Sequence, residues 1–237
     1  MTRSPIWKAI AEALASDIAG GQYPAGSKLP TEADLSARFG VNRHTVRHAL
    51  SDLAAQGLVV PRRGAGVFVT APATEYRIGR RVRFNQNIAA TGQVPSRHLS
   101  RLETCPATLP EAEGLQVPAG TLVHVVEGLS LADGQPLALF RSVLPATRFP
   151  SLLDDLARTP SITAAMASGG VADYTRASTR LTARRADPVQ ALHLRLAEGA
   201  AILRTVAVNV DSAGVPVEYG TTWFAGDRVT LTIQSED

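Results

Sequence analysis

Cysteine and large aromatic residues are scarce in this sequence. The 237 residues include one cysteine, Cys105, and two tryptophans. A single cysteine excludes an internal disulfide and a cysteine-cluster metal site, and it fits a reducing compartment. We therefore expect a cytoplasmic protein with no bound metal and no cofactor.

Long apolar runs are also absent. No segment approaches the roughly 18–20 apolar residues that a membrane span needs, and Glu12 and Asp17 interrupt the N-terminal stretch where a signal peptide would be apolar. The hydrophobic fraction of 45% is that of a globular protein, and 237 residues suffice for two domains. The net charge of +3 is too small to indicate a nucleic-acid partner by itself. The local distribution of charge along the sequence is better evidence.

Residues 1–70 have the pattern of three helices followed by a hairpin. Apolar residues recur every four positions from Ile6 to Ile18, which predicts an amphipathic helix. Thr31 with Asp34 three residues later predicts a capped second helix. Gly40 ends that helix, and Asn42 caps a third.

Basic residues gather on the third helix and the hairpin. From Arg38 to Arg63 there are five arginines and two histidines but one acid, Asp52. Apolar runs on both sides of the turn 62–66 predict two short strands. Surface arginines on a three-helix bundle would give the same composition, but the ordered combination favours a winged helix-turn-helix, whose second helix enters the DNA major groove.

The segment LPTEADLSARFGVNRHTVRHALSDLAAQGLVVPRRGAGVFV, residues 29–69, closely resembles the DNA-binding domain of the GntR superfamily of bacterial repressors. The resemblance implies a homodimer that binds a near-palindromic operator. One position departs from the family, because Ala33 stands where many members have arginine. The implied DNA contacts are Thr31, Asn42, Arg43, His44, Thr45, Arg47, Arg63, Gly64 and Gly66.

Residues 71–75 are predicted to be a linker, and residues 76–237 a second domain. Two hairpin patterns, 121–144 and 201–224, each follow a helix-like stretch, and Gly134–Leu137 matches Gly214–Val217 at an offset of 80 residues. The second domain is therefore predicted to contain two copies of an α-β-β unit. Their hairpins would form one antiparallel sheet with helices against it and a ligand cleft between the halves.

Several polar groups in this domain are candidates for holding a ligand. Four arginines, the last of them Arg83, precede an expected helix start that Asn85 would cap, and a helix N-terminus with arginine favours an anion. The other three, Arg77, Arg80 and Arg81, could equally serve the linker or contact DNA phosphates. Ser161 and Thr163 stand at another helix start, where simple capping is the alternative. The segment 173–180 alternates like a strand with one polar face, and Glu218 lies in an apolar run where a carboxylate needs solvent or a partner.

The second domain resembles the UTRA effector domain of HutC-type GntR regulators. Three of its segments are most similar to the phosphonate-utilisation members of that group: YRIGRRVRFNQN, GGVADYTRASTRLTARRAD and PVEYGTTWFAGDRVTL. The resemblance implies an α+β fold like that of chorismate lyase, with ligand positions at Asn85, Ser161, Thr163 and Glu218. Relatives that sense sugar phosphates often have arginines where Gly128 and Ser130 stand, and an aromatic hydroxyl at Phe224. We expect Arg83, Arg141, Arg176 or Arg180 to supply the missing charge. The full set of expected effector contacts is Arg83, Asn85, Gln86, Asn87, Arg141, Ser161, Thr163, Tyr174, Arg176 and Glu218.

The resemblance implies a ligand-responsive regulator, expected to be a repressor, of phosphonate uptake or degradation genes. We expect a small anionic effector and operator DNA as its partners and no membrane association. A regulator of the same architecture that senses a sugar phosphate or an organic acid is the first alternative. The second is an enzyme with a DNA-binding appendage, in which His124, Glu127 and Glu218 would be acid–base groups. No nucleophile–base spacing or metal motif supports that enzyme, and a fold does not imply a chemistry.

Overall fold

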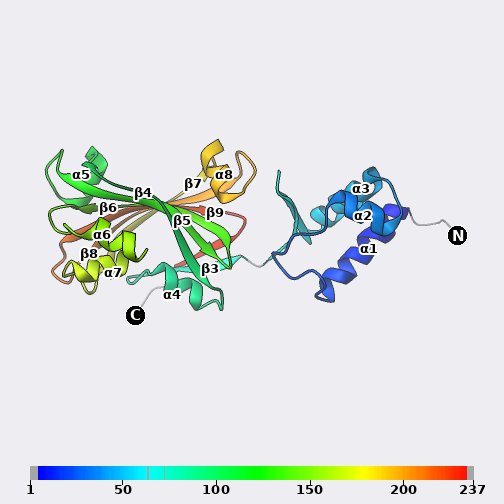
Figure 1. Cartoon of the computed structure of the whole chain (residues 1–237), viewed down its shortest axis with the longest axis horizontal. Coiled ribbons are helices and arrows are strands. Elements are labelled where there is room, and N and C mark those ends of the chain that lie inside the picture. The colour runs from blue at the N-terminus through cyan, green and yellow to red at the C-terminus, as the bar shows by residue number, and fades with distance from the viewer. Residues whose placement is uncertain (1–4, 63, 72, 234–237) are drawn as a thin grey trace. The chain divides into compact units, whose positions relative to one another are not determined.

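The computed structural model describes residues 5–62, 64–71 and 73–233, and the chain divides into two compact units, 1–72 and 73–237 (Figure 1). None of the helices in the described residues is long and apolar enough to cross a membrane.

The first unit is a three-helix bundle with a two-stranded hairpin. Side chains from all three helices meet in one core, where Leu14, Leu35, Val46 and Leu53 are completely buried. The winged helix-turn-helix expected from the sequence is confirmed. Its elements are α1 (Ile6–Ala19), α2 (Glu32–Phe39), α3 (Arg43–Ala55) and the antiparallel strands β1 (Val59–Arg62) and β2 (Gly66–Val69).

The caps expected for α2 and α3 are also present. The Asp34 N–H donates to Thr31 Oγ1 at 3.3 Å and the Thr31 N–H donates back to Asp34 Oδ2 at 3.0 Å. Gly40 ends α2 at φ 63°, a left-handed conformation that costs glycine little. Asn42 Oδ1 accepts from the Thr45 N–H at 2.8 Å and so fixes where α3 begins.

The second unit is built on a six-stranded antiparallel sheet in the order β4-β5-β6-β9-β8-β7. The duplication expected from the sequence is confirmed and includes one more strand per copy, since each copy reads strand, helix, strand, strand. The last strands of the two copies, β6 and β9, pair at the centre of the sheet. The copies are β4 (Pro95–Pro106), α5 (Leu109–Leu115), β5 (Leu122–Ala132), β6 (Gln135–Pro145), and β7 (Thr175–Arg185), α8 (Pro188–Leu194), β8 (Ala201–Val210), β9 (Pro216–Ala225).

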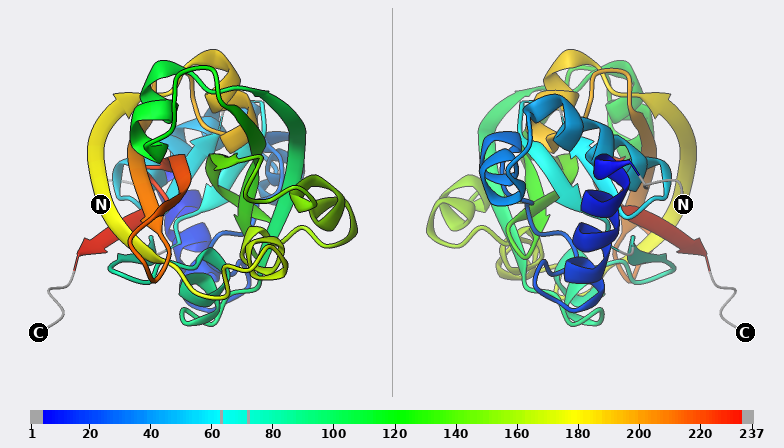
Figure 2. Two further views of the ribbon diagram at one scale, coloured as in Figure 1. Left: turned by 90° about the vertical axis from the view of Figure 1, so that its left-hand side faces the viewer. Right: turned by 90° about the vertical axis from the view of Figure 1, so that its right-hand side faces the viewer.

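Helices cover both faces of this sheet. Figure 1 shows α5 and α8 on one face, and α4 (Phe84–Ala89), α6 (Leu152–Arg158) and α7 (Ile162–Ser168) on the other. The end-on views in Figure 2 show that the sheet is strongly curved. The largest apolar cluster lies beneath α6 and α7, where Phe149, Leu156 and Met166 pack against sheet residues that include Phe140.

Two predictions at the start of this unit are wrong. Thr74 and Glu75, assigned to the linker, begin β3 (Thr74–Ile78), which pairs in parallel with β10 (Val229–Ile233). Thr74, Tyr76 and Ile78 bury alternate side chains, and the partner strand is too distant in sequence for local patterns to reveal it. Asn85 does not cap α4: the N-cap is Arg83, because Phe84 already packs in the core as the first helical residue.

Candidate functional site

The start of α3 presents polar side chains away from the core. Arg43, His44 and Arg47 are exposed, whereas Val46 and Ala49 are completely buried. The helical period therefore turns the basic residues outward as one edge. Thr45 is half-buried, and its hydroxyl donates to Asn42 Oδ1 at 2.9 Å.

Arg47 is held by a carboxylate from the preceding helix. Its Nε and Nη2 donate to the two carboxylate oxygens of Glu32 at 3.0 and 2.7 Å. The hydrogen bond from Arg47 lowers the pKa of Glu32 below its ordinary value. This two-point contact fixes the plane of an arginine that stands on the exposed edge of α3.

The β1–β2 turn depends on glycine at two positions. Gly64 and Gly66 have φ values of 72° and 112°, which other residues rarely adopt. A Cβ at Gly66 would lie 2.6 Å from Cε of Lys28, so a side chain there would displace that lysine. Arg63, the expected wing contact, lies outside the described residues.

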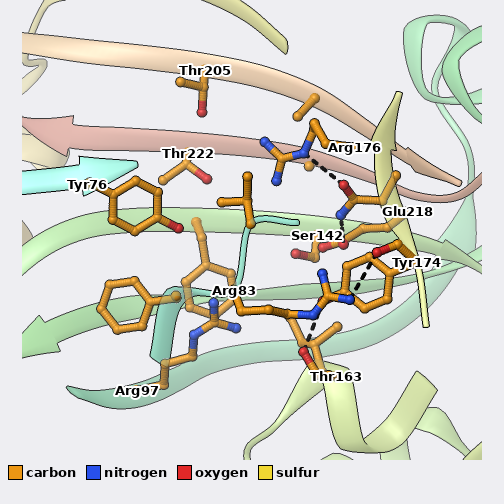
Figure 3. Close-up of a pocket in the computed structure, with 17 residues that line it drawn as sticks. Tyr76, Arg83, Arg97, Ser142, Thr163, Tyr174, Arg176, Thr205, Glu218 and Thr222 are labelled. Atoms are coloured by element: carbon orange, nitrogen blue, oxygen red, sulfur yellow. Dashed lines mark hydrogen bonds between the residues drawn. The ribbon is translucent and has the colours of Figure 1, made fainter. Parts of the chain in front are cut away.

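The second unit contains a polar cavity of about 90 Å³ on the face of the sheet that α4 and α7 cover (Figure 3). At roughly 10–15 Å³ per water-sized sphere it holds several waters or a small ligand. Arginines and hydroxyl groups dominate its walls. The lining residues are Tyr76, Val82, Arg83, Phe84, Arg97, Phe140, Ser142, Ile162, Thr163, Tyr174, Arg176, Thr205, Ala207, Asn209, Glu218, Gly220 and Thr222.

Arg83 is largely enclosed, with a side chain 12% exposed. Its guanidinium lies 3.4 Å from the centre of the Tyr174 ring, and its Nη2 donates to Asp173 Oδ1 at 3.2 Å and to the Tyr174 carbonyl at 3.0 Å. Its Nη1 is buried without a hydrogen-bond partner among the described residues. A buried donor without a partner is costly to the fold.

Arg97 on β4 is a pocket arginine that the sequence analysis missed. It lies opposite Ser130 in the β4–β5 ladder, and its guanidinium stands over the rings of Phe140 at 4.7 Å and Phe84 at 5.3 Å. Its Nε is buried and has no hydrogen-bond partner in the part of the chain that the structure describes. The alternation along β4 could have suggested a sheet-facing arginine, but not the register that brings it to the pocket.

Arg176 begins a chain of hydrogen bonds across β7, β8 and β9. Its Nε donates to Asn209 Oδ1 at 2.8 Å, and Asn209 Nδ2 donates to Glu218 Oε2 at 2.6 Å. The Tyr174 and Thr163 hydroxyls lie 2.9 Å apart. Burial, and next the charge of Glu218, raise the pKa of Tyr174, so its hydroxyl stays protonated at neutral pH.

The structure brings together half of the expected effector residues. Arg83, Thr163, Tyr174, Arg176 and Glu218 line the pocket itself. An adjoining hollow of about 230 Å³, which shares Arg83 and Arg97 with the pocket, is lined by the further expected residues Asn85, Gln86 and Ser161. Ser161 also caps α7, because its Oγ accepts from the Ala164 N–H at 3.2 Å.

Asn87 stands in a third hollow, with Arg77 and Arg81. Its side chain bonds both the N–H and the carbonyl of Arg77, at 3.1 and 3.2 Å, and so fastens β3 to α4. Of the residues that sequence reasoning missed, Asn209 and the hydroxyl-bearing Tyr76, Ser142, Thr205 and Thr222 lie on strands whose pairing the sequence does not reveal.

Arg141 lies outside the pocket, contrary to the prediction. Its neighbours in β6, Phe140 and Ser142, face the pocket, so strand alternation turns Arg141 to the opposite face. There it bonds Glu111 at 2.8 Å and Glu127 at 2.7 Å.

Arg180 does not line the pocket either, since it is exposed on the edge strand β7. The acid–base trio of the enzyme alternative is likewise not assembled. His124 is bonded to Thr104 and to the Phe149 carbonyl, at 2.8 and 3.0 Å, and Glu127 lies on the opposite face of the sheet from Glu218.

Comparison with known proteins places both units in families. Residues 7–69 match the gntR family of bacterial regulatory proteins, and residues 90–230 match the UTRA domain. The HTH-type transcriptional regulator RB1450 of Rhizobium meliloti is 39% identical over 97% of this chain and 95% of its own. The transcriptional repressor NagR of Bacillus subtilis is 27% identical over 96% of this chain and 93% of its own. The crystal structure of PhnF from Mycobacterium smegmatis covers 96% of this chain and 99% of its own, with a TM-score of 0.65 and 26% identity.

Proposed function

This chain belongs to the UTRA-domain regulators of the gntR family, and on that premise we propose that it represses genes for phosphonate uptake or degradation. The effector that controls this repression is a small phosphonate or phosphate-like anion. As a member of the family it is a transcriptional regulator, which binds operator DNA through the first unit and a small-molecule effector through the second. The proposal concerns the effector, the genes and the residues that carry each role.

One small cavity is lined by three arginines, Arg83, Arg97 and Arg176, and this arrangement is the main support for the proposal. Among the described residues that line the cavity, Glu218 is the one acid. Guanidinium groups recognise the oxygens of phosphate-like anions in a planar, two-point geometry that lysine cannot offer. Two of the three arginines also keep a buried N–H without a partner among the described residues. A tetrahedral anion with several acceptor oxygens could accept from the guanidinium groups that line the cavity.

The size of the cavity supports a small ligand. The space of about 90 Å³ has room for a phosphonate with a short side chain. The sequence resemblance to phosphonate-utilisation regulators, which includes the Arg83 and Tyr174 segments, points to the same chemistry.

The exposed edge of α3 is the proposed DNA-reading surface. Arg43 and Arg47 suit the two major-groove acceptors of guanine, and His44 and Thr45 can contact neighbouring bases or phosphates. Thr31 and Asn42 stand at helix N-termini that can bind phosphates, with Gly64 and Gly66 in the wing. A homodimer would place two such helices on a near-palindromic operator in the cytoplasm.

Effector and operator would act on one conformational equilibrium. A ligand that binds one arrangement of the dimer more tightly draws the population toward it, and that arrangement would space the two α3 helices wrongly for DNA.

Sugar phosphates are the second candidate effectors, because hydroxyl groups on the cavity wall could bind a sugar. Ser142, Thr205 and Thr222 offer hydroxyls that could bond a sugar, and the adjoining hollow of about 230 Å³ gives room for one. The similarity to NagR shows that the fold occurs in other repressors as well.

A thermal-shift screen separates the two candidates. Phosphate, methylphosphonate, ethylphosphonate, glucosamine 6-phosphate and citrate are each titrated against the full chain. The proposal expects a concentration-dependent rise in melting temperature with the phosphonates. A rise with the sugar phosphate or citrate alone would overturn it in favour of the alternative.

A further inference from the structure

We infer that the effector carries a positively charged donor, such as an ammonium group, beside its anionic head, and that Glu218 binds it. The inference rests on the proposed function and narrows the ligand from a phosphonate to a zwitterionic aminoalkylphosphonate. It begins from the placement of Glu218, which is the one acid that the described part of the chain contributes to a cavity also lined by three arginines.

Glu218 is a buried carboxylate without an ion pair. The residue is 8% exposed, and its Oε2 accepts one hydrogen bond, from Asn209 at 2.6 Å. Its Oε1 has no hydrogen-bond partner among the described residues, and none of the ion pairs found there includes it. A buried carboxylate in this state is costly unless a donor meets it.

The neighbouring side chains are oriented so that they do not neutralise it. Arg176 donates its Nε to Asn209 Oδ1, which turns the Asn209 amide so that only its NH₂ faces Glu218. Arg83 is directed to Asp173 and to the Tyr174 carbonyl. Arg97 stands over two aromatic rings on another side of the cavity (Figure 3). The open oxygen of Glu218 is therefore an acceptor presented to the cavity.

The cavity thus offers two unlike ends. Arg83, Arg97 and Arg176 line the cavity with guanidinium groups suited to an anion, and Glu218 offers a carboxylate oxygen without a hydrogen-bond partner among the described residues. A plain alkylphosphonate would satisfy the arginines but would set its own charge against Glu218 in a confined space. A zwitterion satisfies both ends, because its ammonium donates to Glu218 while its phosphonate oxygens accept from the arginines.

Three ligands of nearly equal size test the inference in calorimetric titrations with the full chain. They are 2-aminoethylphosphonate, 2-hydroxyethylphosphonate and propylphosphonate, which differ only in ending in an ammonium, a hydroxyl or a methyl group. A charge-assisted hydrogen bond predicts that the amino compound binds at least about tenfold more tightly than either of the others. Equal or tighter binding of the hydroxyl or methyl compound would overturn the inference.

The variant Glu218→Gln tests whether Glu218 is the residue that gives the amino compound its tighter binding. It should abolish the advantage of the amino compound and leave propylphosphonate binding unchanged or tighter. The matched control Glu127→Gln alters a carboxylate on the opposite face of the sheet and should keep the full advantage. An advantage that survives in Glu218→Gln would contradict the assignment of Glu218.

Different results of the ligand series would contradict the phosphonate effector and the ammonium subsite at Glu218. If all three ligands bind alike, the phosphonate pocket stands and the ammonium subsite is wrong. If none of them binds, the phosphonate effector and the subsite are both wrong. Because the ligand series uses the wild-type chain, it decides the matter even if Glu218→Gln does not fold.

Discussion

Arg97 and Ser130 lie opposite each other in the β4–β5 ladder, and Arg97 extends from there into the pocket. The neighbouring strand β4 thus supplies a guanidinium to the pocket at a place where β5 carries Ser130 and Gly128. Position 128 has no room for a side chain, since a Cβ there would lie 2.3 Å from the His98 carbonyl oxygen and 3.0 Å from the Phe140 ring. The Arg97 guanidinium lies 4.7 Å from the centre of the Phe140 ring.

Replacing Arg97 should therefore remove ligand binding. We expect Arg97→Met, which keeps an unbranched chain over Phe140, to weaken phosphonate binding by about tenfold or more through the loss of charged hydrogen bonds. Isothermal titration calorimetry measures the affinity of each protein for the phosphonate. Arg180→Met, which removes an exposed arginine outside the pocket, is the matched control and should bind as the wild type does. Equal weakening in both variants would mean that general charge, not the pocket, attracts the ligand.

Arg43 is expected to read a base. Arg43→Ala should cost about 1–3 kcal/mol of operator binding and relax the base preference at one position of each half-site. Anisotropy titrations against an operator and its single-base variants measure both effects. If affinity and base preference stay unchanged, Arg43 is not a reading residue.

Glu32 is expected to hold Arg47 for specific binding and to oppose unspecific binding. Glu32→Gln removes a negative charge beside Arg47 and loosens its two-point contact. Affinity for random DNA should rise, the slope of binding against salt should steepen by about one ion, and the ratio of operator to random binding should fall. Asp52→Asn changes an acid farther along α3, bonded to Gln56, and serves as the control. A specificity ratio equal to that of the wild type would show that Glu32 has no part in reading.

Glu111 makes the stability of the second unit depend on pH. Burial alone would raise the pKa of Glu111, but the Thr108 N–H and the Arg141 guanidinium outweigh it and leave the pKa below its ordinary value. A lowered pKa means that this stabilisation is complete above the ordinary carboxyl range and is lost as the pH falls through the lowered value. Glu111→Gln should thus cost about 1–3 kcal/mol at pH 7 and progressively less toward acid.

Urea unfolding followed by Trp223 fluorescence measures that cost, in a Trp7→Phe background that leaves one tryptophan, in the second unit. A difference between wild type and Glu111→Gln that is the same at pH 7 and in acid would show that the charge of Glu111 does not stabilise the fold.

Local signals in the sequence predicted the elements, and long-range pairing decided the rest. Caps at Thr31 and Asn42 and the repeated glycine turns needed only neighbours within a few residues. The place of β3 beside β10 and of Arg97 beside the pocket depends on strands that meet across the fold. Arg141 was misplaced for the same reason, since one position along β6 separates the pocket face from the opposite face.

The most direct test of the account measures operator binding with and without ligand in two proteins. Wild type and Arg97→Met are titrated onto the same fluorescent operator in the absence and presence of saturating 2-aminoethylphosphonate. We expect equal operator affinity of the two proteins without ligand, and a ligand-induced loss of affinity in the wild type alone. If the ligand leaves wild-type binding unchanged, or releases both proteins equally, the pocket of Arg83, Arg97 and Arg176 does not control DNA binding.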